Sequence, residues 1–208
     1  MRIARFSWGP VAAMLVVSLA ASATEEPDGT QGADPHAHHR AAAAAPPSPA
    51  QVARRGYDVP DVTLTDENGR GVRLRELMAS GRPLAVNFIF TSCTSICPVM
   101  TTTMLQVQRA LAGDPDQPTY VSISIDPQYD SAQVLKSYAE KYGAEWTFLT
   151  GAPSDVVTVL RAFDAYRGGK MNHAALTLLR VPNATEWIRV EGLVSAGELT
   201  RLWHDAST

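Results

Sequence analysis

The chain has 208 residues, of which 45% are hydrophobic and 19% charged, and its formal net charge is -3 at pH 7. This length allows one domain of ordinary size or two small ones. Without a net basic charge, the sequence argues against a nucleic acid as partner. The sequence holds two cysteines, which excludes both a disulfide-rich small domain and a zinc site with four thiolates.

The first 23 residues have the pattern of a secretory signal peptide. Arg2 and Arg5 precede an uncharged stretch that ends in the small residues Ala21-Ser22-Ala23. A positive start, a short apolar centre and a small-residue cleavage site are typical of such peptides. The alternative is an uncleaved membrane anchor, because the uncharged stretch is at the short limit for spanning ~30 Å of hydrocarbon. Either interpretation predicts that the rest of the chain lies in an oxidising space, the periplasm or the extracytoplasmic face of an inner membrane.

Residues 24–55 have the composition of a flexible linker. They include a run of alanines, several prolines and three closely spaced histidines, His36, His38 and His39. This composition buries too little apolar surface to offset chain entropy, so we expect a mobile tether. The histidines form either a solvated polar patch or a loose copper- or zinc-capturing tract, because neutral imidazoles suit those ions.

From residue 56 onward, strand and helix patterns follow each other along the chain. A hairpin around Asn68-Gly69 is expected first, since residues 62–65 and 71–74 have strand patterns. Further strands are predicted at residues 83–90, 119–125, 146–149, 174–181 and 186–190, the last two forming a second hairpin. Helices are predicted at residues 75–79, 96–111, 131–142, 153–166 and 199–204. This order predicts an α/β domain over residues 56–206, in which helices flank a central mixed sheet and a β-hairpin comes first.

Cys93 and Cys97 lie where the most apolar predicted strand meets the following helix. Unpaired amides and the helix dipole favour a thiolate at such a junction, which lowers the pKa of a cysteine. Because the two residues are four apart, one helical turn would bring both sulfurs to the same face. A reversible disulfide and the binding of a soft metal by two thiolates are both feasible. A purely structural disulfide is disfavoured, since so small a loop gains little entropic stabilisation.

Three motifs in this order resemble the Sco/SenC family of copper-binding, thioredoxin-fold proteins. They are Thr91-Ser92-Cys93-Thr94-Ser95-Ile96-Cys97-Pro98, then Ser124-Ile125-Asp126-Pro127, then a lone His173 before the final hairpin. The resemblance runs from about Tyr57 to Trp203 and implies a thioredoxin-like fold. It also implies one copper, Cu(I) or Cu(II), bound through Cys93, Cys97 and His173. The implied function is assembly of the copper centre of cytochrome c oxidase, with the copper-site subunit, or another copper or thiol protein, as partner.

His173 by itself carries little information, because a lone histidine near a strand start is more often a surface or core residue. Two thiolates nearby would change this, since two cysteines and one histidine suit Cu(I) and also hold Cu(II). No proline lies between Pro153 and Pro182, where a thioredoxin-type reductase would have a cis-proline. Met171 offers a thioether as a further soft donor, although the resemblance does not supply it.

Asp126-Pro127 and Asp130 match the Asp-Pro-x-x-Asp element of the same family. The simpler interpretation is a turn that ends a strand, followed by the N-cap of the helix at residues 131–142. An acidic rim that orients the site or a partner is the alternative.

Two functions from different classes fit these residues. The first is a metallochaperone that delivers copper during oxidase assembly. The second is an enzyme, a thiol–disulfide oxidoreductase in which Cys93 and Cys97 form the redox-active pair and keep copper-site cysteines reduced. A peroxidase fits less well, because no arginine stands beside either cysteine in the sequence. A copper sensor or copper-storage protein would be favoured only by the histidine tract.

Overall fold

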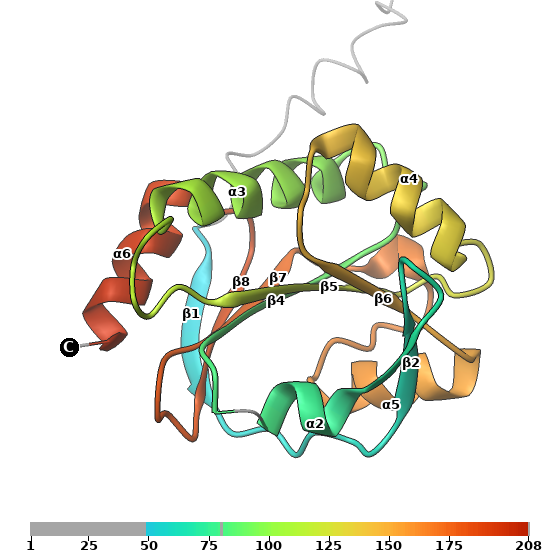
Figure 1. Cartoon of the computed structure of the whole chain (residues 1–208), viewed down its shortest axis with the longest axis horizontal. Helices are drawn as coiled ribbons and strands as arrows, with labels where there is room; N and C mark the ends of the chain where they lie inside the picture. Colours follow the sequence, from blue (N-terminus) through green and yellow to red (C-terminus); the bar gives the residue numbers. More distant parts are fainter. Residues whose placement is uncertain (1–48, 80, 208) are drawn as a thin grey trace, which may run out of the picture. The chain divides into compact units, whose positions relative to one another are not determined.

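An eight-stranded mixed sheet forms the centre of the protein (Figure 1). The structure is a computed structural model and describes residues 49–79 and 81–207. The expected signal peptide or anchor and the three linker histidines lie outside these residues. Within the part of the chain that is described, no helix has the length and apolar character needed to cross a membrane.

The strands lie in the order β1-β8-β7-β4-β5-β6-β2-β3 across the sheet. Their bounds are β1 (Gln51–Arg55), β2 (Thr63–Asp66), β3 (Gly71–Arg73), β4 (Leu84–Ile89), β5 (Thr119–Ser124), β6 (Thr147–Thr150), β7 (Leu176–Arg180) and β8 (Trp187–Glu191). The neighbours of β5, which are β4 and β6, run parallel to it, and all other pairs are antiparallel. The expected mixed sheet and both expected hairpins, β2–β3 and β7–β8, are confirmed.

Helices cover both faces of the sheet. They are α2 (Leu74–Ala79), α3 (Ile96–Ala110), α4 (Ala132–Tyr142), α5 (Pro153–Ala162), α6 (Ala196–Ser207) and the short 3-10 helix η1 (Lys170–Asn172). Helices α3, α4 and α6 lie on one face, with α3 and α4 at the top of Figure 1 and α6 at its left, and α2 and α5 lie on the other face. The sheet is therefore the middle layer of three.

Strand β4 is buried on both faces, as its nearly continuous apolar sequence predicts. Ala85 and Ile89 pack into the core below α3, α4 and α6. Val86 and Phe88 pack into the opposite core with α2 and α5. Fully buried side chains of the size of Val86, Phe88 and Ile89 each contribute about 1.5–3 kcal/mol. This central position fixes the end of β4, from which the cysteine loop departs.

The expected linker ends earlier than predicted, because residues 51–55 form strand β1. This strand pairs antiparallel with β8, and Ala53 lies opposite Arg189. Its residues are mostly exposed and show no apolar alternation, so the sequence pattern gives no strand signal. This edge strand is held in place by backbone pairing with β8 rather than by burial of its side chains.

Helix α5 ends at Ala162, four residues before the predicted end at Tyr166. The chain leaves the helix through Phe163 and then Asp164, whose φ of 51° lies in the left-handed region. Two carbonyls at this point accept hydrogen bonds from the distant side chain of Arg189. A contact so far apart in sequence leaves no local signal, which is why the prediction ran on to Tyr166.

Candidate metal centre

The cysteine loop occupies residues 91–95, between the end of β4 and the start of α3. Cys93 therefore lies before the helix, and Cys97 lies in its first turn. The expectation that both sulfurs share one face of a helix is wrong. The amide nitrogen of Cys97 instead points at Sγ of Cys93, 3.5 Å away, and the Ser95 hydroxyl lies 3.7 Å from the same sulfur. Both cysteines are free thiols in the structure.

The two thiols have opposite electrostatic environments. Burial by itself would raise the pKa of Cys93, but hydrogen bonds from the amides of Cys97 and Ser95 outweigh it and lower the pKa to about 7. Burial raises the pKa of Cys97 to about 12, and the nearby Cys93 and Asp130 contribute to that rise. The expected lowering is thus confirmed for Cys93 and wrong for Cys97.

His173 lies between η1 and β7, with its ring half-buried against the end of β4. Its Nε2 atom is 2.9 Å from the carbonyl oxygen of Phe88. Burial lowers the pKa of His173, and the positive charge of Arg167 lowers it further, so the neutral ring is favoured. Because a carbonyl only accepts hydrogen bonds, Nε2 carries the ring proton. Nδ1 is left as the nitrogen with a free lone pair.

A cavity of about 180 Å³ brings part of the expected site together. Cys93, Met171 and His173 all line it, whereas Cys97 does not and is completely buried. Among residues 49–79 and 81–207, no three His, Cys, Asp or Glu side chains are grouped closely enough to hold a metal ion. Soft thiols and a neutral imidazole fit copper by their chemistry. Cys93 and His173 lie around one cavity, but with Cys97 outside it the three residues do not form a closed ligand set in this conformation.

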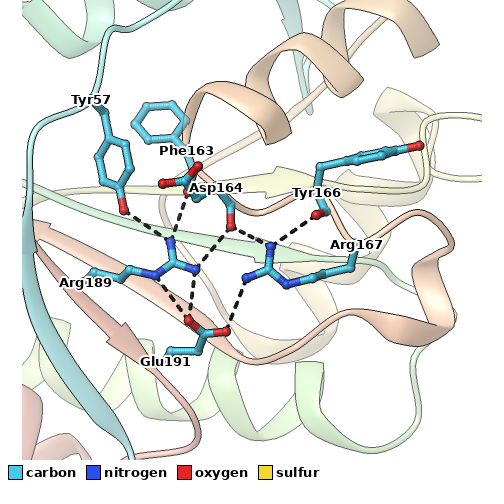
Figure 2. Close-up of polar contacts among 7 residues, drawn as sticks. All are labelled: Tyr57, Phe163, Asp164, Tyr166, Arg167, Arg189 and Glu191. Carbon is cyan, nitrogen blue, oxygen red and sulfur yellow. Dashed lines mark hydrogen bonds and ion pairs between the residues drawn. The ribbon is translucent and has the colours of Figure 1, made fainter.

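The loop that carries His173 is tied to the sheet by a buried arginine that the sequence reasoning missed. Figure 2 shows Arg189 of β8 donating from Nη1 to the carbonyl of Phe163 (3.0 Å) and from Nη2 to that of Asp164 (3.2 Å). Glu191 accepts from Nη2 of Arg189 (3.0 Å) and from Nη2 of Arg167 (3.3 Å). The charge network therefore holds the chain at two points, at Asp164 just after α5 and again at Arg167.

Lys170 ties η1 to the end of β5. Its ammonium group pairs with Asp126 and lies 5.6 Å and 5.9 Å from the ring centroids of Phe90 and Tyr129. Asp126 of the Asp-Pro-x-x-Asp element thus holds the loop that leads to His173. No local sequence pattern indicates this pair, because Lys170 and Asp126 are 44 residues apart.

The simpler interpretation predicted that Asp130 caps the helix, and this is wrong. Ser131 is the N-cap of α4, and its hydroxyl accepts from the amide of Val134. Asp130 is fully buried, and its carboxylate accepts from the amide of Thr91 at 3.2 Å and from the hydroxyl of Ser124 at 2.6 Å. It therefore braces the start of the cysteine loop against the end of β5.

The fold and the site together define a class of proteins. The chain is an α/β domain with a Cys-x-x-x-Cys pair at a strand–helix junction and a histidine on the same cavity as the first cysteine. None of the described peptide bonds is cis, so the cis-proline of a thioredoxin-type reductase has no counterpart in this part of the chain. The SCO1/SenC family model matches residues 55–187, and the chain belongs to this family.

Relatives and solved structures agree with this assignment. The SCO1 protein homolog of Bacillus subtilis is 36% identical over 98 residues, which are 46% of this chain and 50% of that protein. The mitochondrial SCO1 homolog of Homo sapiens is 32% identical over 88 residues, 41% of this chain and 29% of that protein. The chain thus spans half or less of the length of these two relatives.

Two structures illustrate the shared thioredoxin-like fold. BsSco, described as a member of the Sco family of cytochrome c oxidase assembly proteins with a disulfide switch, has a TM-score of 0.61 at 27% identity, covering 74% of this chain and 96% of that one. Yeast Sco1 with copper bound has a TM-score of 0.58 at 21% identity, covering 70% and 87%. At that identity the yeast structure supports the fold alone.

Proposed function

We propose that this protein is an extracytoplasmic copper chaperone that assists assembly of the copper centre of cytochrome c oxidase. It binds one copper through Cys93, Cys97 and His173. The observation that carries the proposal is the cavity that Cys93 and His173 share. Membership of the SCO1/SenC family and the soft thiols and imidazole of the site support the choice of metal. The copper-site subunit of the oxidase, or another copper or thiol protein, is the proposed partner.

The two thiols would contribute differently to copper binding. A thiolate, not a thiol, is the metal ligand. With a pKa of about 7, Cys93 is partly ionised at neutral pH and offers a ligand at once. Cys97, with a pKa of about 12, must lose its proton as the metal arrives. Copper binding is therefore expected to release a proton, and affinity should rise with pH.

His173 already has the protonation state that a ligand needs. Burial favours the neutral ring, and the hydrogen bond to Phe88 leaves Nδ1 free. For the ligand set to close, the segment between Arg167, which is held by Glu191, and His173, which is held by the Phe88 carbonyl, has to adjust. Because η1 and the preceding glycines lie in this segment, a small rearrangement leaves the sheet unchanged.

The test is a titration of the reduced full-length protein with Cu(I) and, separately, with Cu(II). Bound copper and the number of alkylatable thiols are measured in the same samples. One tightly bound copper per chain that protects both thiols is expected. The Cys93→Ser and Cys97→Ser variants serve as matched controls, since each removes one proposed ligand. Copper that leaves both thiols open to alkylation would contradict the proposal.

A second candidate, a thiol–disulfide oxidoreductase, is favoured by the unequal thiols. The Cys93 thiolate would attack a partner's disulfide and form a mixed disulfide, releasing one partner thiolate. Cys97 would then lose its proton and attack the sulfur of Cys93, which frees the second partner thiolate. Two electrons pass to the partner, and this chain ends with a Cys93–Cys97 disulfide. Efficient reduction of insulin disulfides by protein without copper affinity would favour this function over the chaperone.

The proposed location is the periplasm or the extracytoplasmic face of the inner membrane. It rests on the sequence pattern of the first 23 residues, as signal peptide or as membrane anchor. Mass spectrometry of the protein from its native host would distinguish the two, because cleavage after Ala23 leaves a new N-terminus at Thr24.

A further inference from the structure

Met171 lies at the exposed edge of the cavity lined by Cys93 and His173. It is the middle residue of η1, and its side chain is 82% exposed. Residues on either side of it contact the body of the domain, since Lys170 pairs with Asp126 and His173 bonds to the Phe88 carbonyl. The turn is thus tied on both sides, while Met171 faces solvent at the cavity mouth.

Packing does not explain a methionine at this position. Met78, Met100 and Met104 are all buried in the two cores, where flexible thioethers fill irregular space. A single exposed apolar side chain is ordinary on a protein surface. What sets Met171 apart is its location, because it lines the same cavity as Cys93 and His173.

Two sulfur-bearing side chains, those of Cys93 and Met171, line this cavity in the observed conformation. Cys97 is completely buried, and the ring of His173 is held at the Phe88 carbonyl through Nε2, with Nδ1, a harder donor than sulfur, left free. Cys93 and Met171 are therefore the two soft donors that line the cavity, and Met171 is the more exposed of them. A thiolate and a thioether are both soft ligands, which favour Cu(I).

We propose that the Met171 thioether is a Cu(I)-specific donor that, together with Cys93, receives Cu(I) at the mouth of the site before Cys97 and His173 engage. The proposal rests on the proposed copper-binding function and adds a donor to it. No atom changes its oxidation state in this step, because Cu(I) only exchanges ligands. Cu(II) prefers nitrogen and oxygen donors and a tetragonal shell, so Met171 should not affect its uptake.

The experiment follows the methionine methyl groups directly. The reduced full-length protein is labelled with methyl-carbon-13 methionine and given Cu(I) as its acetonitrile complex without oxygen. Met171→Leu identifies the Met171 resonance, and the buried Met78, Met100 and Met104 are internal controls in the same spectrum. The titration is repeated in His173→Ala, in which movement of the loop through coordination of the imidazole is removed. Thiol alkylation is measured in parallel.

The expected result is a shift of the Met171 methyl resonance on Cu(I) addition in both wild type and His173→Ala. Met171→Leu should also slow Cu(I) uptake from a chelator, while its rate of Cu(II) uptake stays at the wild-type value. A shift in wild type that vanishes in His173→Ala would overturn the proposal, because loop movement would explain it. Protected thiols with an unmoved Met171 resonance would overturn it and leave the proposed function intact. If the thiols also stay unprotected, both fail.

Discussion

The backbone amide of Cys97 points at the sulfur of Cys93, with 3.5 Å between nitrogen and sulfur. The first turn of α3 thereby supports a negative charge on the thiol that precedes it. Cys97 itself faces the core below α3, where burial opposes ionisation. The same turn of helix thus produces one ionisable thiol and one that stays protonated.

This asymmetry predicts different pH profiles for the two thiols. In Cys97→Ser, which keeps the amide, alkylation of Cys93 should rise as pH increases through about 7 and level off above it, because the thiolate is the reactive form. In Cys93→Ser, Cys97 should react very slowly up to the highest pH at which the protein stays folded. Iodoacetamide rates measured from pH 5 upward check both. Coinciding midpoints for the two variants would contradict the inferred asymmetry, and urea-unfolded samples provide the reference.

The network around Arg189 gives a prediction about stability. Arg189 is 8% exposed and donates to two carbonyls, to Glu191 and to the hydroxyl of Tyr57. Arg189→Met should lower the free energy of unfolding by about 1.5–3 kcal/mol or more, because hydrogen bonds from a charged group are lost and their acceptors stay partly buried. Urea unfolding followed by circular dichroism measures this.

The matched control for that substitution is Arg73→Met. Arg73 pairs with Asp61 and Glu76, and all three side chains are more than half exposed. Exposed ion pairs are worth about 0.2–1 kcal/mol at most. Equal losses of stability in the two variants would show that the buried network at Arg189 has no special weight.

The parts of the fold that the sequence predicts are those with local signals. The continuous apolar run of β4, the Asn68-Gly69 turn and the cysteines at the strand–helix junction each arise from neighbouring residues. These signals were enough to predict both hairpins and the loop that carries Cys93. The start of α6 was likewise predicted to within three residues, and in the structure the Ser195 hydroxyl accepts there from the amide of Glu198.

The features that were missed depend on contacts between distant parts of the chain. Strand β1 exists through its pairing with β8, and α5 ends just before Phe163 and Asp164, whose carbonyls accept from Arg189. The link between Lys170 and Asp126 joins two surface-type residues that no local pattern connects. The pKa of Cys97 was also predicted wrongly, since a helix start suggests a thiolate until the burial of the particular side chain is known.

Asp130 provides a test that links the brace below the loop to the chemistry of Cys97. Its charge contributes to the raised pKa of Cys97. In a Cys93→Ser background, Asp130→Asn removes the charge and keeps the shape, so the pKa of Cys97 should fall and its alkylation at a fixed alkaline pH should become faster. Asp130→Ala would also leave the Thr91 amide and the Ser124 hydroxyl without their acceptor, at about 1–3 kcal/mol of stability. An unchanged alkylation rate in Asp130→Asn would contradict the electrostatic link.

His173→Ala separates the metal function from redox chemistry. If the ring is a ligand, its removal leaves two thiolates and an open coordination position. A two-coordinate dithiolate still holds Cu(I), so that affinity should fall only modestly, whereas stable Cu(II) binding should largely disappear because Cu(II) prefers nitrogen donors and a fuller shell. The Cys93–Cys97 disulfide should still form, since His173 is no part of the geometry that joins the two sulfurs.

The measurement is the absorption of the Cu(II)–thiolate charge-transfer band in wild type and His173→Ala under identical conditions. His204→Ala is the matched control, because it removes an imidazole from α6 that does not line the cavity. The control should keep the wild-type band, and His173→Ala should lose it. Under the oxidoreductase alternative, His173→Ala would leave copper uptake unaltered and change mainly thiol reactivity. A wild-type band in His173→Ala would therefore remove His173 from the ligand set, and with it the main residue-level argument for copper binding over redox chemistry.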